Sequence, residues 1–190
     1  MVNLIGILKT LSHDPALPAE DHLQIMSILE KVKVKKGEII VRQGTICDSI
    51  YYIEKGLIRQ YYIKEDGKEI TEHFGQTGEY FTAAESMVLK EPSLFESAAL
   101  ENSVLLRIKK DSLETLGDKY LQIEHEYRKM LHYAVVLSQI RMRSIQFETA
   151  FQRYEDLKKN KPYIIQKASS IHIASYLGIT PETLSRIRSM

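Results

Sequence analysis

The sequence predicts an α+β fold in which an antiparallel β-roll, or jelly roll, is followed by one long helix and a C-terminal helix-turn-helix. Three observations support this. Apolar residues alternate with a period of two between residues 32 and 109, and glycine stands at nearly every corner. No proline or glycine interrupts residues 118–146. Residues 170–190 have the pattern of two short helices around a glycine turn.

The chain begins with helical periodicity. Apolar residues at threes and fours predict two helices within residues 4–32, with Pro15 and Pro18 breaking the pattern between them. We expect the second helix to begin near Glu20.

Six strand-like segments follow. They are rich in Ile, Val, Tyr and Phe and cover residues 37–42, 49–54, 57–64, 69–74, 95–100 and 103–109. Residues 64–68 form the expected hairpin loop between the third and fourth strands. Rolls of this kind often enclose a small-molecule pocket.

A helix is predicted over residues 111–146. Its apolar positions form one stripe, made of Tyr120, Ile123, Tyr127, Met130 with Leu131, Ala134 and Leu137. A long helix with one apolar stripe favours pairing with a second copy of itself. The stripe could instead pack on the chain's own roll, and the two interpretations are compatible. A shorter helix over residues 148–159 is expected to lead through 160–162 into the final hairpin.

The final hairpin has the features of a DNA-reading helix-turn-helix. Gly178 suits a left-handed turn, Thr180 an N-cap and Pro181 a first helical residue. Ala174 is small enough for a close helix crossing. The residues expected to pack inward are Ile171, Ile173, Ala174, Leu177, Leu184 and Ile187.

Polar residues remain for the outer face of this hairpin. Thr, Glu, Ser and Arg side chains can read base edges and grip phosphates. The candidate DNA contacts are Ser170, Thr180, Glu182, Thr183, Ser185, Arg186 and Arg188. The alternative is a purely structural helical hairpin, because any such hairpin needs a glycine turn and apolar spacing.

Composition narrows the class of protein. Hydrophobic residues make up 44% and charged residues 27% of 190, as in an ordinary globular protein. No segment approaches the roughly 20 apolar residues needed to span a bilayer, and the N-terminus lacks signal-peptide features. Cys47 is the one cysteine in the sequence, which excludes an internal disulfide and a cluster held by four thiolates. We expect a cytoplasmic protein with no membrane partner.

Charge is distributed unevenly along the chain. Residues 141–190 hold nine Lys and Arg against four acids, a net charge of +5. The whole chain carries +1, so residues 1–140 carry −4. A basic end on an acidic body suits a polyanionic partner for that end.

The order of these parts resembles the Crp/Fnr family of bacterial transcription regulators, from about Glu30 to the end. Residues 36–56, with glycines at matching corners, are similar to the family's first roll strands, and residues 179–188 to its recognition helix. The resemblance implies a homodimer joined through the long helix and a palindromic operator in double-stranded DNA. It implies that Glu182 and Arg186 read base edges, and RNA polymerase is a further candidate partner.

The candidate effector site departs from the cyclic-AMP-binding members of this family. Gly78 and Glu79 resemble the start of the segment that cradles the nucleotide, and Tyr80 is a possible pocket residue. Those members place an arginine on the cyclic phosphate, whereas Ser93 stands at that position here and residues 60–106 contain no arginine. A buried phosphate without a charge-assisted partner is costly. We therefore expect a small-molecule effector other than cyclic AMP, or none.

The DNA-binding end also departs from the family. Many members carry a β-hairpin wing after the recognition helix, whereas the printed sequence ends at Met190. Phosphate contacts of a wing are therefore expected to come from elsewhere or to be missing.

Other chemistries have little support in the sequence. His125 and His132 lack a second ligand at i+3 or i+4, so no metal site is expected, and no enzyme motif is present. A metal-dependent jelly-roll enzyme would need clustered His and Glu on the strands, where His73 stands alone. The remaining alternative is a ligand-binding regulatory module that contacts protein and not DNA.

The sequence thus divides into three parts. Residues 1–115 form an effector-sensing roll with N-terminal helices, residues 116–146 a dimerisation helix, and residues 147–190 a helix-turn-helix domain.

Overall fold

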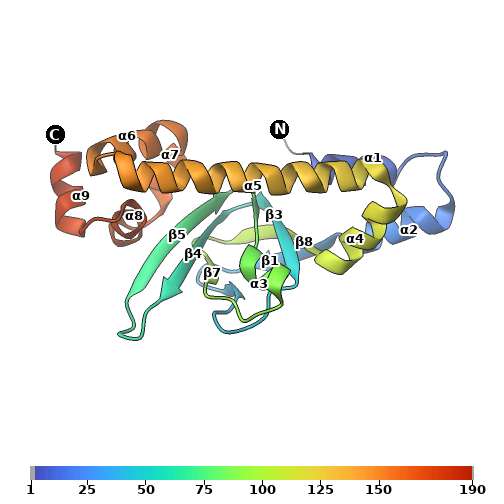
Figure 1. Ribbon diagram of the computed structural model, residues 1–190, viewed down its shortest axis with the longest axis horizontal. Coiled ribbons are helices and arrows are strands. Elements are labelled where there is room, and N and C mark those ends of the chain that lie inside the picture. The colour runs from blue at the N-terminus through green and yellow to red at the C-terminus, as the bar shows by residue number, and fades with distance from the viewer. Residues whose placement is uncertain (1–2, 190) are drawn as a thin grey trace.

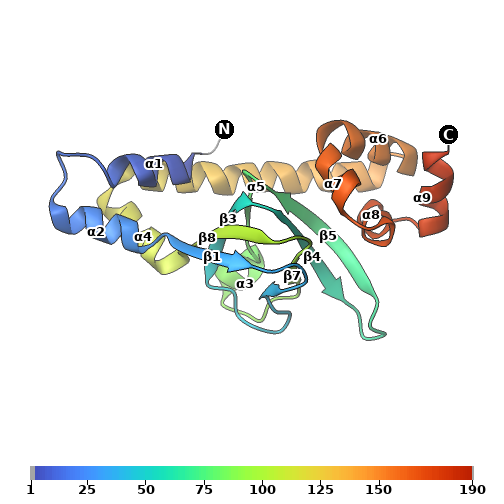
Figure 2. The same cartoon turned by 180° about the vertical axis from the view of Figure 1, so that it is seen from behind.

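A computed structural model describes residues 3–189 and has a β-roll at its centre (Figure 1). The long helix α5 (Leu121–Phe147) runs the length of the molecule along one side of the roll. Two N-terminal helices lie at one end of α5 and four C-terminal helices at the other, as the reverse view also shows (Figure 2).

The remaining elements follow in chain order. The helices are α1 (Leu4–Leu11), α2 (Ala19–Ser27), α3 (Ala84–Leu89), α4 (Lys110–Lys119), α6 (Ala150–Asn160), α7 (Pro162–Lys167), α8 (Ser170–Leu177) and α9 (Pro181–Arg188). The strands are β1 (Glu30–Val34), β2 (Ile39–Val41), β3 (Ser49–Lys55), β4 (Leu57–Ile63), β5 (Glu69–Gln76), β6 (Tyr80–Phe81), β7 (Glu96–Ala99) and β8 (Ser103–Lys109).

The roll consists of two four-stranded antiparallel sheets. Their strand orders are β1-β8-β3-β6 and β2-β7-β4-β5. Apolar side chains from both sheets, such as Ile53, Ile58 and Leu105, fill the space between them. Gly56 links β3 to β4 with φ of 126°, and a Cβ there would lie 2.1 Å from the Ser103 hydroxyl oxygen, so only glycine fits this corner. All six predicted strands are present, whereas β1, β6 and the short helix α3 were not predicted.

The predicted helix over residues 111–146 is wrong in one respect, because it is broken into α4 and α5. The break is at Tyr120, which is extended (φ −124°, ψ 101°) and buried. Its hydroxyl donates to the buried carboxylate of Asp21 on α2, which also pairs with Lys119. These tertiary contacts outweigh a local preference for helix that contains no breaking residue.

The predicted apolar stripe divides into two parts along the long helix. Ile123, Tyr127 and Met130 are buried in one cluster with α1, so here the stripe packs on the chain's own body. From Leu131 onward the apolar residues of α5 are exposed. They include Tyr133, Val136, Ile140 and Phe147, with exposed fractions of 57%, 47%, 46% and 79%.

The C-terminal helices follow the prediction with one addition and one correction. Thr149 and Gln152 form a capping box at the start of α6, and α7 is an unpredicted turn of helix after it. Ile171 was expected to pack inward but is 68% exposed. The buried residues of α8 are Ile173, Ala174 and Leu177, and Ile171 lies about 100° around the helix from the centre of that stripe.

Candidate nucleic-acid interface and effector cavity

The helix pair α8 and α9 is built around a glycine turn. Gly178 is left-handed (φ 70°, ψ 32°), and the Thr180 hydroxyl accepts a hydrogen bond from the Thr183 amide at 3.2 Å. Leu184 and Ile187 of α9 pack on Ala174, which is fully buried at the crossing. The predicted caps and turn are therefore in place.

The outer face of α9 is polar, as predicted. Glu182, Ser185, Arg186 and Arg188 are exposed, and Thr183 is half-buried. Ser170 and Thr180, the other two candidate DNA contacts, are also exposed. The structure therefore brings all seven candidate DNA contacts to the accessible surface of one helix pair.

Local hydrogen bonds orient the charged groups on this face. Arg188 donates from Nη1 to the Ser170 hydroxyl at 2.8 Å, which joins the end of α9 to the start of α8. Hydrogen bonds from the Thr180 hydroxyl and the Glu182 amide lower the pKa of the Glu182 carboxyl. An ionised carboxylate thus stands one turn before the Arg186 guanidinium, a pairing that can accept from one base and donate to another.

The helix pair also packs directly on the roll. Leu57 and Phe74 of the roll belong to the same hydrophobic cluster as the core of α6 to α9. The Ser175 hydroxyl accepts from the Thr71 amide of β5 at 2.8 Å and donates to the Glu69 carbonyl at 3.3 Å. The edge of β5 is thereby bound to α8 through its backbone.

Two arginines hold the end of α8 from the opposite side. Arg141 of α5 donates to the Tyr176 carbonyl, and its guanidinium lies 4.0 Å from the centre of the Tyr176 ring. Arg153 of α6 donates from Nη2 to the Leu177 carbonyl at 2.9 Å and from Nη1 to the Glu148 carbonyl. Cations at carbonyls of a helix C-terminus are favourable.

Side chains complete this contact between roll and helix pair. Lys161 forms an ion pair of 2.9 Å with Glu79, and Tyr163 donates to Glu101 at 2.6 Å. Lys167 lies 3.9 Å from the same Glu101 carboxylate. We call the contacts that helices α6 to α8 make with the roll and with α5 the interdomain contact.

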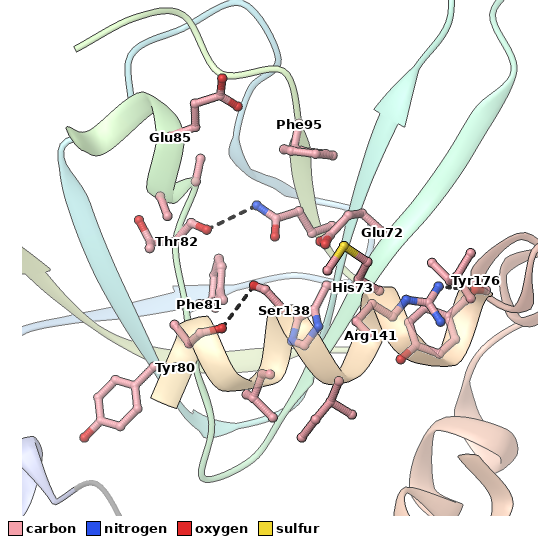
Figure 3. Close-up of a pocket in the computed structure, with 18 of the residues that line it drawn as sticks. Glu72, His73, Tyr80, Phe81, Thr82, Glu85, Phe95, Ser138, Arg141 and Tyr176 are labelled. Atoms are coloured by element: carbon pink, nitrogen blue, oxygen red, sulfur yellow. Dashed lines mark hydrogen bonds between the residues drawn. The ribbon is translucent and has the colours of Figure 1, made fainter. Parts of the chain in front are cut away.

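A cavity of about 880 Å³ adjoins the interdomain contact (Figure 3). Its walls come from the β6–α3 segment, the loop before β7, strand β5, helix α5 and the end of α8. Figure 3 shows Glu72, His73, Thr82, Ser138 and Arg141 around this space.

The predicted effector residues lie only partly in this cavity. Tyr80 and Ser93 contribute to its wall, whereas Gly78 and Glu79 lie in the turn between β5 and β6. The Ser93 hydroxyl donates to the Phe95 carbonyl at 2.8 Å, so its hydrogen is used within the loop before β7. Glu79 accepts from the Gln76 amide and pairs with Lys161 of the C-terminal helices.

Several cavity residues were missed from the sequence. Glu72 alternates with buried strand neighbours and looks like an ordinary exposed position, and Ser138 and Arg141 look like polar positions of a surface helix. Only His73 gave a signal, as the one histidine in the predicted roll.

The stability of the protein is expected to fall between pH 7 and pH 5 because of His73. Burial, aided by nearby Lys161 and Arg141, lowers the pKa of His73 to about 4 against 6.5 in an unfolded chain. The unfolded state thus binds a proton in this range that the folded state does not, so stability is lost as pH falls. We expect the loss to be about 1–2 kcal/mol.

This prediction is checked by urea unfolding at both pH values in the parent protein and in His73→Gln. Other titrating groups contribute equally to both proteins, so the variant should lose about 1–2 kcal/mol less. An equal loss in the two proteins would contradict the assignment to His73.

The other features considered from the sequence are a metal site, the cysteine and a membrane span. Within residues 3–189, no group of three or more His, Cys, Asp and Glu side chains is placed to hold a metal ion. Cys47 is buried, with its Sγ 3.4 Å from the Ser49 carbonyl. Over the same described residues, no helix is long and apolar enough to cross a membrane.

Comparison with known proteins identifies a family model for part of the chain. Residues 31–120 match the model of the cyclic nucleotide-binding domain. The match covers the roll and α4, and it ends before α5.

Curated relatives extend the similarity to most of the chain. Regulatory protein HlyX of Actinobacillus pleuropneumoniae is 29% identical over 176 residues, which cover 86% of this chain and 72% of HlyX. The fumarate and nitrate reduction regulatory protein of Yersinia pestis is 26% identical and covers 86% of this chain and 70% of its own.

Solved structures share the fold. FixK2 from Bradyrhizobium japonicum superimposes with a TM-score of 0.70 at 19% identity and covers 85% of this chain and 83% of its own. A putative regulator of the crp/fnr family from Eubacterium rectale gives a TM-score of 0.69 at 18% identity, with coverage of 90% and 82%.

Proposed function

We propose that this chain is a DNA-binding transcription regulator of the Crp/Fnr type, which binds a palindromic operator as a homodimer with α9 in the major groove. The observation that carries this proposal is the exposed polar face of α9 after a capped glycine turn. We propose a cytoplasmic location, because the relatives are regulators from bacteria, whose DNA lies in the cytoplasm. A regulator bound beside a promoter would also contact RNA polymerase, to which we assign no surface.

Two side chains on α9 are assigned to base reading. Arg186 donates two hydrogen bonds to a guanine, because a guanidinium matches the O6 and N7 acceptors of that base. Glu182 accepts from the N4 amino group of a cytosine. Both side chains are exposed and one helical turn apart, so they reach neighbouring positions in the groove.

The second half of α5 is assigned to dimerisation. Tyr133, Ile140 and Phe147 recur every seven residues, and Val136 lies three after the first. All four side chains are exposed in the single chain, and they form one stripe along α5. The partner is a second copy of this chain, with the two helices α5 side by side.

The cavity is assigned to a small-molecule effector other than cyclic AMP. It borders both α5 and the end of α8, so an occupant would contact the dimer helix and the helix pair together. An effector changes DNA affinity only through different contacts in the two states, and we assign these contacts to the cavity walls on α5 and α8.

Selection of bound duplexes from a random-sequence pool, with and without cyclic AMP, tests the function. We expect an enriched palindrome with half-sites about one helical turn apart, and the same enrichment with cyclic AMP. A Glu182→Ala, Arg186→Ala double variant is the matched control and should enrich nothing. No enrichment by the parent protein under either condition would contradict the proposal, and a requirement for cyclic AMP would contradict the effector assignment.

Arg188→Ala is expected to flatten the salt dependence of DNA binding. A side chain that neutralises one phosphate contributes about one unit to the slope of log affinity against log salt concentration. Arg188 suits that role, because it is exposed at the end of α9 and already oriented by Ser170. Affinity should be measured on one operator at several salt concentrations.

Arg128→Ala serves as the control for this change. Arg128 is an exposed arginine in the N-terminal half of α5, and among the described residues its side chain contacts His125 at 3.3 Å. It removes the same charge outside the helix pair and should leave the slope unchanged. Equal slopes for Arg188→Ala and the parent would show that Arg188 does not contact a phosphate.

A further inference from the structure

The cavity contains few positive charges that a ligand could use. Arg141 and Arg153 are bound to carbonyls at the end of α8, and Lys161 is paired with Glu79. His73 is neutral at pH 7, since burial lowers its pKa to about 4. Arg143 is the remaining basic residue at the cavity, and its side chain is exposed near the end of α5.

A ligand phosphate or carboxylate in the centre of the cavity would therefore have to displace an existing contact. Taking Arg141 or Arg153 would leave helix carbonyls without their donors, and taking Lys161 would leave Glu79 unpaired. Each of these losses costs part of the affinity that the new contact would provide. The cavity therefore disfavours anions for two reasons. An arginine is missing at the Ser93 position, and these three basic side chains already have partners.

Free negative charge is present in the same cavity. Glu72 on β5 and Glu85 on α3 both line it, and among the described residues neither side chain has a hydrogen bond or an ion pair. Figure 3 shows Glu72 on β5 facing the cavity, with Ser138 and Arg141 of α5 on the other side. Both carboxyl side chains are exposed, and partial desolvation raises the pKa of the Glu72 carboxyl while the nearby charge of Arg141 lowers it.

The rest of the wall is mostly apolar or aromatic. Phe81, Phe95 and Met87 come from the roll, and Leu131 and Leu137 from α5. Such a surface binds the apolar body of a ligand, and aromatic faces also attract cations. The volume of about 880 Å³ lies within the range of small-molecule sites.

We propose that this cavity binds a positively charged, largely apolar small molecule, with its cationic group on the Glu72 carboxylate and its body against Phe95 and α5. The inference rests on the proposed control by an effector, and it names the chemical class of that effector. A cation at the exposed Glu72 carboxylate would form an ion pair there, for which the described residues of the folded chain provide no partner.

Three probes with one ring system and different charges test this proposal. Calorimetry on the full-length dimer without DNA compares 2-naphthylmethylammonium, 2-naphthylmethanol and 2-naphthoate. We expect the cation to bind about tenfold more tightly than the neutral alcohol, as for one charge-assisted hydrogen bond, and the anion to bind more weakly than both.

Two isosteric variants locate the binding. Glu72→Gln should reduce the affinity for the cation to that for the alcohol and leave the alcohol unchanged. Glu65→Gln, in the exposed loop between β4 and β5, removes the same charge away from the cavity and should change neither. Circular dichroism confirms that both variants fold as the parent does.

Three outcomes would overturn the inference. They are equal or tighter binding of 2-naphthoate, a preference for the cation that survives in Glu72→Gln, and no binding of any of the three probes. Operator binding is measured separately without probe. Its failure would remove the proposed DNA-binding function and leave the ligand result standing.

Discussion

Ile140→Glu is expected to separate the dimer into monomers and to lower operator affinity by about 10²- to 10⁴-fold. Ile140 lies at the centre of the exposed stripe of Tyr133, Val136 and Phe147 on α5. Two copies would bring two carboxylates together in an apolar seam, where each loses its hydration without a partner. When one subunit of a dimer binds its half-site, the second subunit is held close to the other half-site, which raises the affinity by about 10²- to 10⁴-fold. Separate monomers lose this gain.

Sedimentation and operator titration at matched protein concentration measure the two effects. Gln139→Glu is the control, because it adds the same charge one residue earlier, about 100° around the same helix. It should remain dimeric and bind DNA as the parent does. A dimeric Ile140→Glu, or equal effects of the two changes, would place the dimer contact elsewhere.

Arg186→Ala is expected to weaken operator binding by about 1–3 kcal/mol and to relax specificity at one base pair. The cause is the loss of a guanidinium that donates to two acceptors of one guanine. Arg186 is exposed, and its contact with Thr183 is 3.5 Å long, so the fold does not depend on it. Affinities should be measured on the operator and on all three substitutions of that base pair.

The pattern of loss distinguishes base reading from phosphate contact. Loss confined to the preferred base pair supports the assignment, whereas equal loss on every sequence would make Arg186 a phosphate contact. Arg128→Ala again removes one exposed arginine outside the helix pair and should leave both affinity and specificity unchanged.

The sequence was informative wherever local physics determines the structure. Gly178, Thr180 and Pro181 define the turn and the start of α9 with short-range bonds alone, and those features are confirmed. Strands between glycine corners were found for the same reason. By contrast, the break at Tyr120 depends on Asp21, which is 99 residues away in the sequence.

Long-range placement also explains what was missed in the two sites. Glu72 and Arg141 become cavity residues only because β5, α5 and α8 meet. The apolar stripe was identified as one feature, yet α1 covers its first half and leaves its second half exposed. Neither distinction is contained in the spacing of residues along one helix.

The hydrophobic cluster shared by Leu57, Phe74 and the C-terminal helices has a consequence for modularity. A C-terminal fragment cut after α5 would expose the part of this cluster that the roll now covers, such as the ring of Tyr176, whose centre lies 5.3 Å from that of Phe74. A chimaera that takes helices α6 to α9 from a relative would therefore also need that relative's residues at the positions of Leu57 on β4 and Phe74 on β5. Because the roll and the C-terminal helices share this cluster, we expect them to unfold together as one cooperative unit.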